Sequence, residues 1–320
     1  MNFLRQRALT LKRVALVFLV LIAVMPVGTF VAATHYLFYS RHHSYKTTPK
    51  AYDLSYQDVS FSSEDGVGLV GWFISPKHRV NSETKIPVVI LVHGHHSNMG
   101  DPKILGNVAL PLSKHNIAVL TIDLRNHGSS QDKKPVTLGY LESNDILAAI
   151  AFLREHAQSF GIDTERIGIW GSSMGAASSI HAAAKDFRLG HSSIRSVFVD
   201  SSFAYTTEPV VLQLTKDGIP RFMQDLVVFW MRHIPDVDVG MQNPIDVVSD
   251  IKAPIFFVHS KKDTVVLAKD ALSLRERFAK DNPQIKSELW LSDATGHVRT
   301  ALEYKEAYAS KLVAFFEAYL

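Results

Sequence analysis

Short apolar runs alternate with longer amphipathic segments through most of the chain. The apolar runs predict eight strands, at residues 56–61, 67–75, 87–92, 117–122, 166–170, 197–200, 255–259 and 287–291. The first two flank Glu64-Asp65-Gly66, which predicts a hairpin. Most of the later runs are apolar throughout instead of alternating, as is typical of strands buried on both faces. The pattern therefore predicts a mostly parallel eight-stranded sheet flanked by helices.

Helical periodicity follows several of these strands. Residues 141–155 place Ile146, Ala149, Ile150 and Leu153 on one face. Residues 174–185 are small and alanine-rich, as expected of a closely packed helix, and residues 298–320 predict a final helix. Repeated strand–helix alternation indicates an α/β fold.

A further helix is expected between Pro220 and Pro235, inside an insertion at about 203–248. Its broad apolar face, on residues 221–234, predicts a small helical cap packed over a site. Contact of this face with a bilayer is the alternative interpretation.

The N-terminal segment has a different pattern. A basic tail at 1–13 precedes residues 14–39, which carry no formal charge apart from the titratable His35. As a helix this run would be about 39 Å long, enough to cross a bilayer. It predicts an N-terminal transmembrane helix, although Val31-Ala32-Ala33 also resembles a signal-peptide cleavage site. The apolar run continues past that site, which favours an uncleaved anchor.

The cations of the tail predict an orientation for that anchor. They favour a single-pass protein with its N-terminus in the cytoplasm and residues 55–320 on the outer side, after a polar connector at 40–54. The lipid bilayer is then an expected partner. Export after signal-peptide cleavage is the alternative location.

Charge and cysteine content narrow the possible functions. The net charge is +3, and residues 1–39 contribute +4, so the remaining chain carries −1. This gives nucleic-acid binding little support. The chain has no cysteine, which excludes disulfides, cysteine–zinc sites and a thiol nucleophile.

Gly171-Ser172-Ser173-Met174-Gly175 matches G-x-S-x-G between a predicted strand and a predicted helix. This is the setting of a nucleophile elbow, in which flanking glycines permit a sharp turn that exposes the serine oxygen. We therefore expect Ser173 to be a nucleophile. A simple Gly/Ser turn is the alternative interpretation.

A serine nucleophile needs a base and an acid. His297 follows the last predicted strand, and its place after the serine and the acid along the chain favours it as the base. Asp263 follows the strand after the cap and is the favoured acid. Asp200, at the end of the preceding strand, remains the alternative.

Two backbone N–H groups should stabilise the oxyanion of the transition state. We expect one from Met174, directly after the nucleophile, and one from His95 in the loop that follows residues 87–92. His93 and His95 could instead bind a metal, but no carboxylate-rich set accompanies them. The sequence thus predicts no metal and no cofactor.

Taken in order, His93-Gly94, the elbow at Ser173, Asp263 and His297 resemble the α/β-hydrolase superfamily. The stretch Asp123-Leu124-Arg125-Asn126-His127-Gly128-Ser129-Ser130 is similar to the D-x-R-x-H-G-x-S of its lipase-like and serine-aminopeptidase-like members. The resemblance implies that this stretch is chiefly structural. The anchor followed by a compact domain resembles membrane-anchored bacterial hydrolases of the group.

Three functions agree with these residues. The first is a serine hydrolase that cleaves carboxylic esters or thioesters through an acyl-enzyme, and the second is an aminopeptidase-like serine peptidase with the same triad. The third is a non-catalytic, membrane-tethered binding protein. Because Ser, Asp and His candidates all follow predicted strands, the sequence favours an enzyme acting on a small acyl ester, thioester or peptide.

Overall fold

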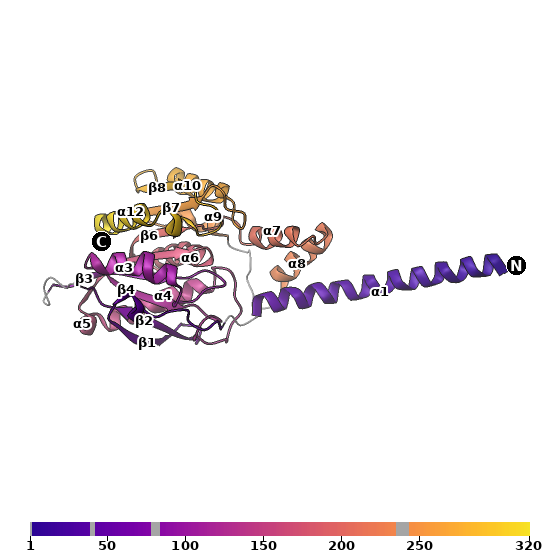
Figure 1. The fold of residues 1–320 in the computed structure, drawn as a ribbon, viewed down its shortest axis with the longest axis horizontal. Helices are drawn as coiled ribbons and strands as arrows, with labels where there is room; N and C mark the ends of the chain where they lie inside the picture. The colour runs from indigo at the N-terminus through magenta and orange to yellow at the C-terminus, as the bar shows by residue number, and fades with distance from the viewer. Residues whose placement is uncertain (1, 39–41, 78–83, 235–242) are drawn as a thin grey trace.

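An eight-stranded sheet forms the centre of the molecule (Figure 1). The computed structural model describes residues 2–38, 42–77, 84–234 and 243–320. The strands are β1 (Tyr56–Ser62), β2 (Gly68–Ile74), β3 (Ile86–Val92), β4 (Ala118–Asp123), β5 (Ile162–Ser172), β6 (Ile194–Asp200), β7 (Ile255–Ser260) and β8 (Ser287–Ser292). Their order is β1-β2-β4-β3-β5-β6-β7-β8. Only the pairings of β2 with its two neighbours are antiparallel, so the predicted mostly parallel sheet is confirmed.

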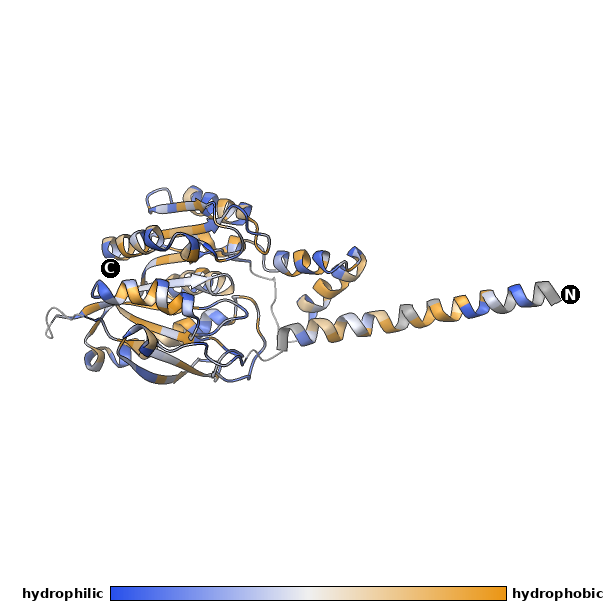
Figure 2. Ribbon diagram, viewed as in Figure 1, coloured by the Kyte–Doolittle hydropathy of each residue, from blue (hydrophilic) through white to orange (hydrophobic). Residues whose placement is uncertain are grey.

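Helices cover both faces of this sheet. One face packs on α4 (Glu142–Glu155), α6 (Met174–Arg188) and α10 (Ala268–Asp281), and the other on η2 (Leu105–Ala109), α3 (Leu110–Lys114) and α12 (Lys305–Tyr319). In β3, Val88, Ile90 and Val92 belong to the first core, whereas Val89 and Leu91 belong to the second. Burial on both sides explains why the strands are apolar at successive positions, which Figure 2 shows as hydrophobic colour along the central strands.

The C-terminal segment differs from the predicted continuous helix over 298–320. Val298 has a φ of 51°, in the left-handed region, so no helix begins there. A short α11 (Thr300–Glu303) is followed by a break at Tyr304 before α12 begins. The remaining short elements are η1 (Pro49–Tyr52), α2 (Pro102–Ile104), α5 (Ala157–Phe160), α9 (Pro244–Val247) and η3 (Val248–Asp250).

The insertion after β6 carries two cap helices, α7 (Glu208–Lys216) and α8 (Arg221–His233). The second coincides with the helix expected between Pro220 and Pro235. Residues 235–242 of the predicted insertion lie outside the described residues.

The N-terminal helix α1 (Asn2–Phe38) extends away from the body, and its C-terminal end lies beside α8 (Figure 1). Thr29 and Ala33 are buried at this contact. The ring of Phe30 meets the ring of Trp230 edge to face, with centroids 5.3 Å apart. The last turns of α1 therefore belong to the cap.

The structure of α1 differs from the transmembrane helix that the sequence predicts. Among the helices that the structure describes, none combines the length and the apolar character needed to cross a bilayer. The predicted transmembrane anchor over 14–39, of which residue 39 lies outside the described residues, is therefore wrong. The single-pass location derived from it, with the catalytic domain on the outer side, is wrong as well. Local hydropathy did not reveal that the end of this helix packs on a partner within the same chain.

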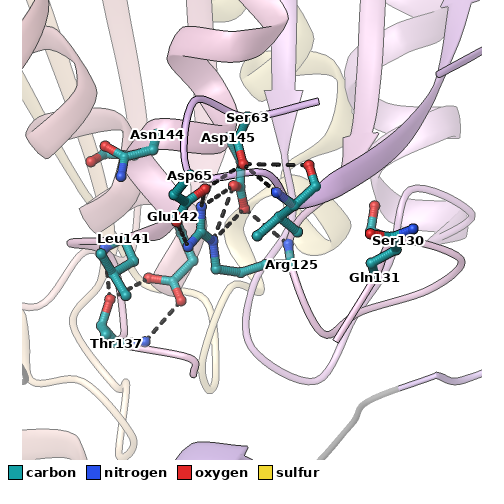
Figure 3. A network of polar contacts seen from close by, with 12 residues as sticks. Ser63, Asp65, Arg125, Ser130, Gln131, Thr137, Leu141, Glu142, Asn144 and Asp145 are labelled. Atoms are coloured by element: carbon teal, nitrogen blue, oxygen red, sulfur yellow. Dashed lines mark hydrogen bonds and ion pairs between the residues drawn. The ribbon is translucent and has the colours of Figure 1, made fainter. Parts of the chain in front are cut away.

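A buried ion-pair network ties the segment that follows β4 to α4 and to the hairpin between β1 and β2 (Figure 3). Arg125 is fully buried and donates to both carboxylate oxygens of Asp145, at 2.5–3.1 Å. It also donates to Asp65 in the hairpin between β1 and β2, at 2.7 and 3.2 Å. Since the guanidinium has no access to water, these two carboxylates are what compensates its charge.

Replacing Asp145 with Asn leaves the buried charge of Arg125 half compensated. We expect Asp145→Asn to lower the free energy of unfolding by about 3–5 kcal/mol. Urea denaturation followed by tryptophan fluorescence measures this change. Asp225→Asn is the matched control, because Asp225 pairs with Arg221 on the surface of α8, where such pairs contribute less than about 1 kcal/mol. If both variants lost the same free energy of unfolding, the buried network would stabilise the fold no more than a surface ion pair does.

Candidate active site

Ser173 occupies a sharp turn between β5 and α6. Its φ of 53° and ψ of −120° place a residue with a side chain in a sparsely populated region. Its N–H donates to the carbonyl of Asp200, the last residue of β6, at 2.8 Å. This hydrogen bond and the packing of α6 hold the strained turn in place.

The two flanking glycines are required by close packing. A Cβ on Gly171 would lie 2.3 Å from the carbonyl oxygen of Gly175. A Cβ on Gly175 would lie 2.3 Å from the carbonyl oxygen of Val92, at the end of β3. Neither position has room for a side chain, so the G-x-S-x-G pattern follows from the contact of α6 with the neighbouring strands.

The structure brings the side chains of Ser173, His297 and Asp263 together. The His297 Nε2 atom lies 2.8 Å from the Ser173 hydroxyl, and Nδ1 lies 2.7 Å from Asp263 Oδ2. Asp263 follows β7 and His297 follows β8, so both stand beyond the carboxyl ends of parallel strands. The second oxygen of Asp263 accepts the N–H groups of Val265 and Val266, at 2.8 and 3.0 Å, which fixes the carboxylate in its loop.

Asp263 remains ionised although its side chain is buried. Burial alone would raise its pKa, but hydrogen bonds from His259 and His297, together with the charge of His297, hold the pKa well below its usual range. An ionised carboxylate accepts a hydrogen bond from the Nδ1–H group of His297. In that tautomer the lone pair of Nε2 faces the Ser173 hydroxyl.

Asp200 has different partners. Its carboxylate accepts hydrogen bonds from Ser201 and Tyr308, both at 2.9 Å, and burial raises its pKa. The phenol of Tyr308 in turn accepts a hydrogen bond from the indole of Trp170, at 2.9 Å. Asp200 therefore links the elbow to α12, and the carboxylate that contacts His297 belongs to Asp263.

The residues expected to form the oxyanion hole lie beside the serine. Met174 is the first residue of α6, and Gly94 is so close that an added Cβ would meet Ser173 Cβ at 3.2 Å. His95 occupies the turn that follows Gly94, and His95 and Met174 line the same cavity as Ser173.

That cavity has a volume of about 820 Å³ and opens beside Ser173 and His297. Apolar side chains form most of its wall. The cap and α1 contribute Ala32, Phe203, Val210, Leu214 and Val227, and the body contributes Ile104, Val108, Trp170 and Ala301. The site is thus an apolar pocket with a hydroxyl–imidazole pair at its wall, as is typical of small-molecule sites.

Comparison with known proteins identifies similar hydrolases. The BD-FAE family model matches residues 77–203, which include the elbow. Alpha/beta hydrolase domain-containing protein WAV2 of Arabidopsis thaliana is 23% identical over 279 residues, 83% of each chain. The esterase Pf2001 of Pyrococcus furiosus superimposes with a TM-score of 0.71 at 26% identity, covering 88% of this chain and 98% of its own. The chain is an enzyme of the α/β-hydrolase superfamily.

The fold is shared more widely among hydrolases. The acylaminoacyl peptidase of Pyrococcus horikoshii superimposes with a TM-score of 0.62 at 18% identity, over 83% of this chain and 42% of that one. The expectation of a serine-hydrolase fold is confirmed, and the alternative of a non-catalytic binding protein is overturned.

The structure of this α/β hydrolase also explains the D-x-R-x-H-G-x-S stretch. The carboxylate of Asp123 accepts hydrogen bonds from Met99 N–H, Ser129 N–H and the phenol of Tyr45, at 2.6–2.9 Å. A Cβ on Gly128 would lie 1.9 Å from that carboxylate, so only glycine fits. These contacts order the loop next to the serine, and spacing alone could not have revealed them because their partners lie far away in the sequence.

A metal site at His93 and His95 is the alternative interpretation of this part of the sequence. Within the part of the chain that the structure describes, no three histidine, cysteine, aspartate or glutamate side chains gather in a way that could hold a metal ion. The imidazole of His93 instead contacts backbone groups, with Nδ1 2.8 Å from the Gly94 carbonyl and Nε2 3.1 Å from the Leu124 N–H.

Proposed function

We propose that this chain hydrolyses carboxylic esters or thioesters, with Ser173 as nucleophile, His297 as general base and Asp263 as the acid that orients His297. The observation that carries the proposal is the continuous chain of contacts from Ser173 to His297, at 2.8 Å, and from His297 to Asp263, at 2.7 Å. These are the distances over which a proton moves from a serine to a base.

The reaction begins when His297 Nε2 removes the Ser173 proton and Oγ attacks the acyl carbon. The carbonyl oxygen becomes negatively charged and accepts hydrogen bonds from the N–H groups of His95 and Met174. His297 then gives its proton to the leaving alkoxide or thiolate, and an acyl-enzyme remains. His297 then takes a proton from a water molecule, which attacks the acyl carbon, and gives this proton to Ser173 Oγ as the bond from Oγ to the acyl carbon breaks. A carboxylic acid is released and the enzyme is regenerated.

The mostly apolar wall of the cavity favours a substrate with an apolar acyl group. Its wall is mostly apolar, and its 820 Å³ exceeds what a short acyl group occupies. Pf2001, which shares 26% identity, is an esterase by its name. The cap helices and the end of α1 contribute part of that wall, so they determine which acyl groups fit.

The nucleophile is tested with the two adjacent serines of the elbow. We expect Ser173→Ala to lower kcat for p-nitrophenyl butyrate by roughly 10⁴-fold or more, because the attacking oxygen is gone. A fluorophosphonate probe should label the unchanged enzyme but not this variant. Ser172→Ala is the matched control and should keep the label. Labelling that persists in Ser173→Ala, or no labelling of the folded enzyme, would refute the proposal.

The acid is tested by comparing two buried carboxylates. We expect Asp263→Asn to lower kcat by roughly 10⁴-fold, because an amide can hold His297 in the wrong tautomer and cannot stabilise its charged form. Asp200→Asn should lower kcat by less than about tenfold, since Asp200 contacts Ser201 and Tyr308 instead of the imidazole. Steady-state kinetics on both variants measures the difference, and the reverse order would make Asp200 the acid.

A peptidase that removes residues near a peptide N-terminus is the second candidate. Two carboxylates at the cavity wall, Asp101 and Asp217, favour it because a peptide amine needs an acidic partner. Both already accept local hydrogen bonds, Asp101 from Ser97 at 2.8 Å and Asp217 from Gln213 at 2.9 Å. These contacts, and the apolar remainder of the wall, make the ester the better substrate.

A side-by-side assay separates the two functions. We expect kcat/KM for p-nitrophenyl esters to exceed that for aminoacyl p-nitroanilides by roughly 10²-fold. Asp217→Asn should leave ester hydrolysis unchanged. Preference for the anilide, together with its loss in Asp217→Asn, would establish the peptidase instead.

A further inference from the structure

The buried imidazole of His127 contacts two backbone carbonyl groups. Its ring is fully buried, with Nδ1 2.7 Å from the Arg125 carbonyl oxygen and Nε2 2.6 Å from the His95 carbonyl oxygen. A carbonyl oxygen only accepts hydrogen bonds, so each ring nitrogen must donate. Only a doubly protonated, positively charged ring makes both hydrogen bonds at once.

The neighbouring His93 shows the opposite arrangement. Its Nδ1 lies 2.8 Å from the Gly94 carbonyl oxygen and donates to it, while Nε2 accepts the Leu124 N–H at 3.1 Å. One nitrogen donates and the other accepts, so this ring is neutral, and burial lowers its pKa. The two rings lie 5.0 Å apart and bind the carbonyls of consecutive residues, Gly94 and His95.

Binding these carbonyls sets the direction of the amides that follow them. In a trans peptide the C=O and the next N–H point in opposite directions. The hydrogen bond from His93 to the Gly94 carbonyl therefore fixes the orientation of the His95 N–H. In the same way, the hydrogen bond from His127 to the His95 carbonyl fixes the orientation of the His96 N–H. Gly94 packs directly on Ser173, so these amides belong to the wall beside the nucleophile.

We propose that His127 is a positioning residue for the oxyanion hole: its imidazolium holds the His95 carbonyl and thereby fixes the C-terminal side of His95, whose N–H, oriented by His93 through the Gly94 carbonyl, is the proposed donor to the charged intermediate. This inference rests on the proposed hydrolysis at Ser173. A neutral His127 would have only one N–H, so one of the two carbonyls would be released and the turn would lose a fixed orientation. No part of the turn needs to reorganise during the reaction when both hydrogen bonds are present.

Charged and titratable groups surround this ring on several sides. The rings of His93 and His95 lie 5.0 and 5.9 Å away, and the Arg125 guanidinium, two residues before it, is paired with Asp65 and Asp145. The carboxylate of Asp123 packs against the following Gly128, whose carbonyl lies 2.6 Å from His42 Nδ1. Asp123 Oδ1 lies 4.0 Å from His93 Nε2, so this carboxylate faces the same group of buried rings from the end of β4.

The charge of the ring is tested by nuclear magnetic resonance on the full chain with ¹⁵N-labelled histidine. We expect both ring nitrogens of His127 to carry protons at pH 7, with the signals assigned by their loss in His127→Gln. A neutral tautomer at pH 7 would overturn the inference. This measurement requires no activity, so its outcome is independent of whether esters are the substrate.

The effect on catalysis is tested with His127→Gln and the matched control His115→Gln. The side chain of Gln cannot donate to carbonyls on two sides, whereas His115 is exposed and pairs with Glu317 at the surface. We expect His127→Gln to lower kcat for p-nitrophenyl butyrate by roughly 10- to 100-fold with little change in KM. Affinity for a boronic acid, which forms a charged tetrahedral adduct on the serine, should fall by the same factor.

A role in folding alone predicts other results. Unchanged kcat and boronate affinity relative to His115→Gln, or an increase in KM alone, would overturn the positioning role. If His127→Gln does not fold, the ring signals of His127 are assigned by their loss in His127→Asn, and the protonation state in the unchanged enzyme still decides the inference. If the unchanged enzyme hydrolyses no ester, the proposed function fails, while the protonation measurement still tests the contact of His127 with the His95 carbonyl.

Discussion

The strained backbone of Ser173 is the constraint on which the site depends. A residue at this φ and ψ persists only where its surroundings determine its conformation. Here β5 ends in register beside β3 and β6, with Gly171 opposite Val92 on one side and Val199 on the other. The helix that follows then packs against the end of β3 so closely that Gly175 has no room for a side chain. The parallel sheet therefore supplies the packing that keeps the hydroxyl raised above its edge.

The same edge of the sheet collects the polar groups that make the hydroxyl reactive. Asp263 and His297 follow β7 and β8, and the Gly94–His95 turn follows β3, so each comes from a different strand end. Loops at such an edge would move independently without further contacts. Backbone N–H groups fix Asp263, two imidazoles bind the turn after β3, and the carboxylate of Asp123 holds the loop that carries His127. Buried, fully paired polar groups of this kind specify one arrangement of the site.

Much of this could be predicted from the sequence because it follows from local rules. Continuous apolar runs located the eight strands, and a serine between glycines at a strand–helix junction located the elbow. The preference for Asp263 over Asp200 rests on its placement after the strand that follows the cap, and in the structure the Asp263 carboxylate contacts His297. The roles of these residues remain predictions until variants are assayed.

Other features depended on partners far away in the chain. Nothing local to His127 shows that its ring binds the carbonyl of His95, 32 residues earlier. Nor does the hydropathy of residues 14–39 show that Thr29, Phe30 and Ala33 lie against α8 or that Ala32 lines the cavity. A pattern read along the chain reports how apolar a helix is, but not what covers it.

The edge of the sheet that carries Ser173 and the cavity wall that faces it are held in place by different interactions, and this difference bears on substrate specificity. The elbow, the imidazole and the oxyanion turn are held by the sheet and by buried hydrogen bonds, so their geometry leaves little freedom. The wall facing them comes from α7, α8 and the end of α1, which pack on one another through apolar contacts such as Phe30 on Trp230. Apolar packing tolerates changes of shape at modest cost, whereas a buried hydrogen-bond network does not. Substrate preference can therefore change through the cap while the chemistry at Ser173 stays the same.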